Sequence, residues 1–106
     1  MKGNSKKGSA VRDLGCTIAE LWAHLESQFQ PGMTRDNWGV AWEVDHFYPL
    51  SMADLTDRTQ FLAVNNWQNL RPMTPAENDS KDNKVYPEAQ SLFDRLCAEF
   101  REKVAA

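Results

Sequence analysis

The residues of this chain that are best suited to perform chemistry are an aspartate and a histidine, which are adjacent in the stretch EVDHFYPLS, residues 43–51. Asp45 and His46 stand among large apolar side chains, where a carboxylate needs a cation or several hydrogen-bond donors. The imidazole is the side chain best suited to exchange a proton near neutral pH. The pair is therefore either a satisfied structural ion pair or half of a metal site.

More polar residues follow downstream in NWQNLRPMTPAENDSK, in the order Asn69, Asn78 and Lys81. Asp45 offers an anionic oxygen and Asn78 a neutral amide oxygen. So sparse an oxygen set suits one divalent ion, Mg²⁺ or Mn²⁺, with water and phosphate in its remaining positions. His46 could then take a proton from an attacking water. That role requires a neutral imidazole, so the rate should rise as pH passes its pKa, about 6.5 if unperturbed.

Together, WEVDHFYPLS and NWQNLRPMTPAENDSK resemble the HNH endonuclease family of phage and prophage type, which has the ββα-metal fold. The family pattern is W-x-(I/V)-D-H-x-x-P-L-S, then N-L-(Q/R)-P, then N-x-x-K. The resemblance covers about residues 8–96, most of the chain. It implies a metal-dependent hydrolase that nicks or cuts DNA and leaves a 5′-phosphate and a 3′-hydroxyl.

The resemblance also implies a division of roles among the motif residues. His46 is the expected general base, and Asp45 and Asn78 are the expected metal ligands. Asn69 completes the catalytic pair with His46, as a residue that orients or braces the His46 region without binding metal. Each basic candidate has an ordinary alternative as a solvated surface charge. The side chains expected to contact the substrate phosphate are Lys81, Arg71 and Lys84.

The chain departs from the family at several positions. Many relatives carry histidine where this chain has Glu43. On a regular strand Glu43 and Asp45 share a face, so Glu43 either touches the water shell of the metal or lies in solvent. Relatives often have histidine near Asn66 and tryptophan near Thr74, and these changes affect substrate contacts more than chemistry. Relatives often have a longer basic segment upstream, so we expect a short form with reduced DNA affinity.

The elements that must position these residues are indicated by apolar periodicity and turn residues. They predict an α+β fold, in which a ββα-metal finger made of a small β-hairpin and a helix packs with flanking N- and C-terminal helices. In chain order we expect a helix over 16–29, a strand over 40–47, a short helix within 51–64, an extended segment over 65–73, a short helix from Thr74 and a helix over 87–104.

Local signals sharpen two of the helix starts. Thr17 and Glu20 have the spacing of a capping box, and so do Thr74 and Glu77. His24 falls beside the apolar stripe of the first helix rather than on it, so we expect it at the surface.

Bulk composition is that of one small domain of 106 residues with a net charge of −3. Residues 1–12 are basic without acids, and we expect a flexible tail that is either solubilising or a phosphate-contacting arm, followed by a nuclease domain over 13–106. Cys16 and Cys97 are expected to be free and reduced. No membrane span or secretory signal is visible, so a cytoplasmic monomer in a bacterial or phage-infected cell is expected.

The expected partner is DNA, and phage packaging proteins such as terminase are further candidates. The main alternative is a non-catalytic phage DNA-packaging accessory or DNA-binding module that keeps the HNH fold. A nuclease acting as a toxin or defence effector is a second alternative. A zinc hydrolase would want more histidine or cysteine ligands than this chain offers.

Overall fold

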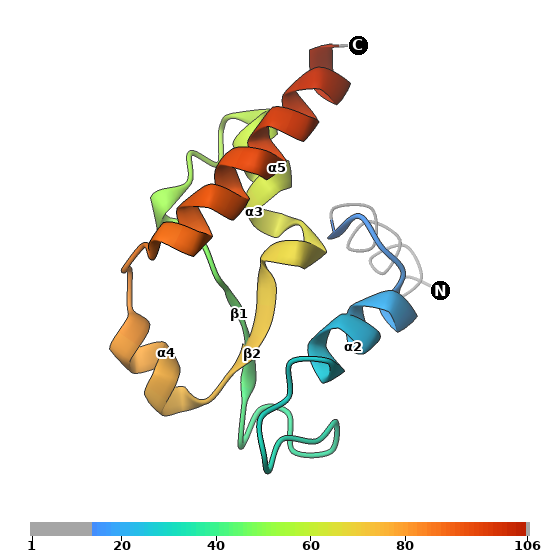
Figure 1. Cartoon of the computed structure of the whole chain (residues 1–106), viewed down its shortest axis with the longest axis vertical. Helices are drawn as coiled ribbons and strands as arrows, with labels where there is room; N and C mark the ends of the chain where they lie inside the picture. Colours follow the sequence, from blue (N-terminus) through green and yellow to red (C-terminus); the bar gives the residue numbers. More distant parts are fainter. Residues whose placement is uncertain (1–13, 106) are drawn as a thin grey trace.

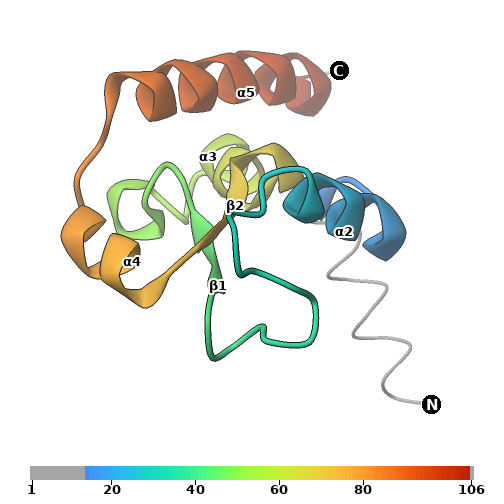
Figure 2. The same ribbon diagram turned by 60° about the horizontal axis from the view of Figure 1, so that its bottom comes forward.

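The computed structural model describes residues 14–105, so the expected tail over 1–12 lies outside the described residues. In Figure 1 and Figure 2, α2 and α4 lie on opposite sides of two strands, and α3 and α5 lie together near one end of those strands. In chain order the elements are α2 (Ile18–Glu26), β1 (Glu43–His46), the 3₁₀ helix η1 (Leu50–Met52), α3 (Arg58–Asn65), the 3₁₀ helix η2 (Trp67–Asn69), β2 (Leu70–Met73), α4 (Pro75–Lys81) and α5 (Pro87–Ala105).

The sheet is a single antiparallel pair in which β1 and β2 are neighbours. The register places Asp45 opposite Arg71 and His46 opposite Leu70. Residues 47–69, including α3, connect the two strands, and β2 leads directly into α4. The predicted α+β class, with a small two-stranded sheet and flanking helices, is confirmed.

Strand β1 is shorter than the strand expected over 40–47. The residues just before β1 form turns. The backbone N–H groups of Val40 and Ala41 both donate to the Asn37 carbonyl, at 3.1 and 2.9 Å. Gly39 has a φ of 89°, a left-handed conformation that glycine adopts without steric cost. The extended pairing therefore begins only at Glu43.

The two predicted capping boxes are present. In α2 the Glu20 N–H donates to the Thr17 hydroxyl oxygen at 3.0 Å, and the Glu20 carboxylate accepts from the Thr17 N–H at 2.8 Å. In α4 the Glu77 N–H donates to the Thr74 hydroxyl oxygen at 3.1 Å, and the Glu77 carboxylate accepts from the Thr74 N–H at 3.0 Å. Each box satisfies N–H groups that the first turn of a helix leaves without partners. The start of α4 is therefore set by residues next to it in sequence.

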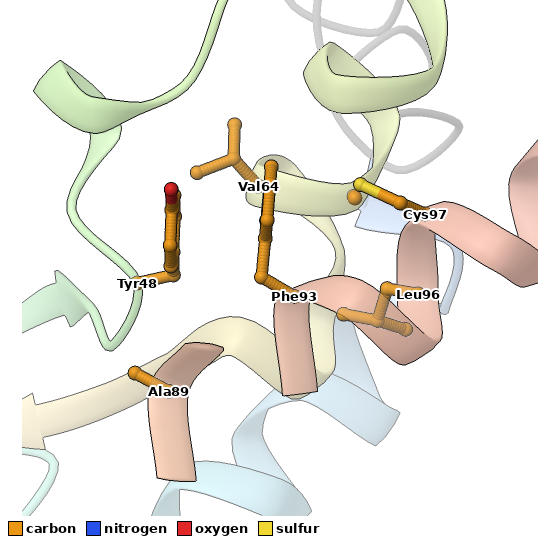
Figure 3. Close-up of a cluster of buried hydrophobic side chains, with 7 residues drawn as sticks. Tyr48, Val64, Ala89, Phe93, Leu96 and Cys97 are labelled. Carbon is orange, nitrogen blue, oxygen red and sulfur yellow. The ribbon is translucent and has the colours of Figure 1, made fainter. Parts of the chain in front are cut away.

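The larger apolar core lies between α3, α5 and the segment that follows β1. Figure 3 shows the Tyr48 ring lying parallel to the Phe93 ring of α5, and their centroids are 3.9 Å apart. This stack fixes the chain two residues after His46 to the longest helix. The buried members of this core are Tyr48, Ala63, Val64, Ala89, Phe93, Leu96 and Cys97.

A second cluster joins α2 to the turns before β1. Its buried members are Leu25, Met33 and Trp42, and the indole N–H of Trp42 donates to the Thr34 carbonyl at 2.7 Å. His24 differs from its expected surface position. It is partly buried, with Nε2 2.7 Å from the Leu70 carbonyl oxygen. It therefore ties α2 to the start of β2, a long-range contact that periodicity within α2 could not reveal.

Within residues 14–105, no helix combines the length and apolar character needed to cross a membrane. Cys16 and Cys97 are free thiols, as expected. Cys97 belongs to the main core, and burial raises the pKa of its thiol. Its contribution is therefore packing.

Candidate active site

Asp45, His46, Asn78 and Lys81 line one open pocket of about 560 Å³. Strand β1 supplies the first pair, and α4 supplies the second pair. They meet because β2 pairs with β1 and leads at once into α4, whose start is set by the Thr74 capping box. The remaining lining residues are Pro49, Leu50, Ser51, Leu55, Asp79, Asp82 and Asn83.

A smaller hollow of about 210 Å³ adjoins this pocket, and Asp45 and Asn78 line both. Glu43 lines the smaller hollow, on the same side as Asp45. The expectation that these two carboxylates share a strand face therefore agrees with the structure. Glu43 itself is exposed. Asp45 and Asn78 thus form the wall between two open spaces, each able to admit water.

The carboxylate of Asp45 faces the amine of Lys81. Asp45 Oδ2 lies 3.2 Å from Lys81 Nζ, and the side chains are 21% and 3% exposed, respectively. The same Oδ2 is buried and has no hydrogen-bond donor among the described residues. The contact is an ion pair without a hydrogen bond. Lys81 therefore occupies the carboxylate oxygen that a bound cation would need.

The imidazole of His46 is biased toward its neutral form. Burial lowers its pKa below the ordinary value of 6.5, and the charge of Lys81 lowers it further. Interaction with the Asn65 side chain and the charge of Asp45 oppose that shift without cancelling it. His46 is consequently able to accept a proton at neutral pH.

Asn69 is a bracing residue and is only 1% exposed. Its Oδ1 accepts from the Tyr48 N–H at 2.8 Å, and its Nδ2 donates to the carbonyls of Tyr48 and Val64 at 3.1 and 2.9 Å. The Phe47 N–H also donates to the Asn69 carbonyl at 2.7 Å. These bonds hold the chain immediately after His46.

The three basic candidates occupy different positions. Lys81 lines the pocket but is buried against Asp45. The Arg71 guanidinium lies 3.4 Å from the centroid of the Phe47 ring, and Arg71 lines a separate hollow of about 500 Å³ with Gln28 and other residues. Burial lowers the pKa of Arg71, while Asp45 raises it. Lys84 is exposed after α4. The fold therefore does not gather these cations at one phosphate position.

One contact across the pocket rim was missed by reasoning from sequence. The Ser51 hydroxyl donates to Asn83 Oδ1 at 2.7 Å and so joins η1 to the turn after α4. Ser51 matches the final serine of the first family pattern, which is the sequence signal that could have singled it out. This bond connects the two walls that flank Asp45 and His46.

The donor set fits a divalent ion of the hard, oxygen-binding kind. The described residues contain no group of three or more histidine, cysteine, aspartate or glutamate side chains able to hold a metal. Asp45 with Asn78 is instead a sparse set of one carboxylate and one amide. Asp45 Oδ2, which makes no hydrogen bond with the described residues and is balanced by the Lys81 charge, supports the fit, because Mg²⁺ binds carboxylate oxygens and keeps several waters.

Comparison with known proteins finds two viral relatives. The chain is 32% identical over 100 residues to an uncharacterized protein of Acanthamoeba polyphaga mimivirus, across 94% of this chain and 43% of that protein. It is 31% identical over 108 residues to a second uncharacterized protein of the same virus, across 94% of this chain and 48% of that protein. The chain thus spans less than half of the length of either relative. No family model matches the chain, and no solved structure matches it.

Proposed function

We propose that this protein is a metal-dependent endonuclease of the HNH type that hydrolyses DNA phosphodiester bonds. The observation that carries the proposal is the single pocket lined by Asp45, His46 and Asn78. These residues come from β1 and α4, and β2, which pairs with β1, leads directly into α4. Two paired strands followed by a helix support a ββα finger. The sequence motifs quoted above supply the second line of support.

In the proposed mechanism, His46 accepts the proton of the attacking water. Its partly buried imidazole has a lowered pKa, so the neutral form needed for this step dominates at pH 7. Asp45 and Asn78 would hold a divalent ion, Mg²⁺ or Mn²⁺. The chemistry supplied by an ion held there is stabilisation of charge on the phosphate and on the leaving oxygen.

Supporting roles follow from position. Asn69 is proposed as a positioning residue, because its bonds to the backbone of Tyr48 hold the segment that follows His46. Lys81 lies at the pocket and is proposed to serve the substrate phosphate. Arg71 lines the neighbouring hollow and Lys84 is exposed after α4, so we assign them to other phosphates along the DNA strand.

One observation favours the non-catalytic alternative of a DNA-packaging accessory module, with partners such as terminase. The Lys81 ammonium already faces the Asp45 carboxylate. A module that had lost metal chemistry could keep such a pair for stability alone. Intrinsic cleavage without any partner protein separates the two functions.

The test is incubation of the purified protein with supercoiled plasmid in Mg²⁺, Mn²⁺ or EDTA, beside His46→Ala and Asp45→Asn. Ser91→Ala, an exposed change on α5, is the matched control. Metal-dependent nicking by the unaltered protein and by the control, lost in both site variants, would support the nuclease. Cutting by all four proteins would indicate a contaminant. Absence of cutting by folded protein in either metal would favour the accessory module.

A further inference from the structure

Lys81 is an unusual lysine, because its side chain is only 3% exposed. Lysine is almost never fully buried unless it is paired. Its partner is Asp45, at 3.2 Å, which is also the carboxylate assigned to the metal. Lys81 and Asn78 are three residues apart on α4 and therefore project from the same face of the helix. Lys81 therefore lies against the carboxylate, and Asn78 lines the same pocket as Asp45.

We propose that Lys81 is an internal counter-ion that competes with the divalent cation for Asp45. In this inference, which rests on the metal site of the proposed function, binding of the cation expels the Lys81 amine from Asp45. The amine then becomes available to a phosphate oxygen of the substrate. Binding of the cation at Asp45 would thus release the positive charge of Lys81 for the substrate.

Competition follows from charge. Asp45 carries one negative charge, and its Oδ2 faces Lys81 without a hydrogen bond. A divalent ion on the same carboxylate would lie a few ångströms from the ammonium. Repulsion between cations at such separations is only weakly screened in a partly buried site. The two cations therefore cannot both hold Asp45 at full strength, and the one with the higher charge density prevails.

Two hollows adjoin Lys81 and could receive its amine after it leaves Asp45. Lys81 lines both the pocket beside His46 and the separate hollow beside Arg71 and Ser80. Its four-carbon stem can rotate without movement of α4, because lysine is a flexible point charge. Lys81 therefore lies between two hollows, into either of which the amine would move on leaving Asp45.

The first experiment measures Mn²⁺ binding by calorimetry and thermal unfolding in EDTA and in Mn²⁺. It compares the unaltered protein with Lys81→Met, which keeps the stem and removes the charge. Lys84→Met is the matched control, because it makes the same charge change at an exposed lysine three residues along the chain. Competition predicts that Lys81→Met binds Mn²⁺ about tenfold or more tighter, with the control near the unaltered protein. Lys81→Met should also unfold at a lower temperature than the unaltered protein in EDTA. Mn²⁺ should raise the melting temperature of the variant more than that of the unaltered protein.

A second measurement uses the unaltered protein and stands even if Lys81→Met fails to fold. Lysine labelling by reductive methylation, read residue by residue by mass spectrometry, should be slow at Lys81 in EDTA and fast at Lys84. Mn²⁺ should accelerate labelling of Lys81 several-fold and leave Lys84 unchanged. The acceleration should be absent in Asp45→Asn, which lacks the carboxylate for which the cations compete.

The outcomes separate this inference from the proposed function. Tighter binding by Lys81→Met with metal-induced labelling of Lys81 supports competition, even if the protein never nicks plasmid. Mn²⁺ binding that needs Asp45 but is unchanged or weakened in Lys81→Met, with constant labelling, overturns competition and leaves the metal site standing. Absence of Mn²⁺ binding in both proteins overturns the inference together with the metal site.

Discussion

The side-chain amide of Asn69 and the backbone of Tyr48 form a closed pair of hydrogen bonds. Asn69 Oδ1 accepts from the Tyr48 N–H at 2.8 Å, and Asn69 Nδ2 donates to the Tyr48 carbonyl at 3.1 Å. The Tyr48 ring meanwhile stacks on Phe93. The segment after His46 is thus held by a polar clamp on its backbone and by an apolar contact on its side chain.

Replacing Asn69 by alanine should therefore weaken both the fold and the site. The change removes three buried bonds and leaves the Tyr48 and Val64 backbone groups without partners, so a loss of about 3 kcal/mol in unfolding free energy is expected. Urea denaturation measures this loss. Ser91→Ala, at an exposed position of α5, is the control and should cost under about 1 kcal/mol. A cost for Asn69→Ala as small as that of the control would contradict the bracing role.

The rate of DNA cleavage should increase with pH and then level off. A general base must be deprotonated, and the pKa of His46 is lowered from 6.5, chiefly by burial. The rise should therefore have its midpoint below pH 6.5, with the plateau reached by neutral pH. Initial nicking rates at saturating metal, measured beside the imidazole titration by NMR, test this expectation. A rate that falls as pH rises through the same range would reject His46 as the base.

The Asp45–Lys81 pair should show strong thermodynamic coupling. Asp45→Asn leaves the Lys81 ammonium buried without its counter-charge, and a loss of about 2 kcal/mol is expected after allowance for the partial exposure of Asp45. The double variant Asp45→Asn with Lys81→Met should recover most of that loss, because no unpaired charge remains. Denaturant unfolding in EDTA of the unaltered protein, the two single variants and the double variant completes this double-mutant cycle. Simple additivity of the two single changes would show that the ion pair contributes nothing.

Asp82 occupies a backbone conformation that glycine adopts more easily. Its φ is 46° and its ψ is −123°, and the Lys84 N–H donates to the Lys81 carbonyl at 2.8 Å across this turn. These angles match the first central position of a type II′ turn, where glycine is favoured. Asp82→Gly should raise the unfolding free energy by about 0.5 kcal/mol. Asn83→Gly, with no positive φ to relieve, should lower it, and a thermal melt of each variant distinguishes the two.

Much of the local structure was predictable because its causes lie within a few residues. The capping boxes at Thr17 and Thr74 depend on side chains three positions along the chain, so their helix starts could be inferred from sequence. Asp57 caps α3 in the same local way. The motif residues of the candidate site also came from sequence, and the fold brings Asp45, His46 and Asn78 to one pocket.

The burial of individual polar side chains could not be predicted in this way. The sequence predicts Lys81 as either a phosphate contact or a solvated charge, and the fold buries it against Asp45. His24 is expected at the surface but contacts the Leu70 carbonyl. Arg71 packs over Phe47 and lines a different hollow. Each of these positions depends on elements that are far apart in sequence.

The sequence by itself determined the class of fold, the starts of the capped helices and the identity of the residues that could perform chemistry. Tertiary structure decided which of those residues meet. The physical reason is that capping and turn formation act within a few residues, whereas the β1–β2 register and the packing of α5 on Tyr48 combine many weak contacts between distant segments. The meeting of Lys81 with Asp45 arises only from that combination.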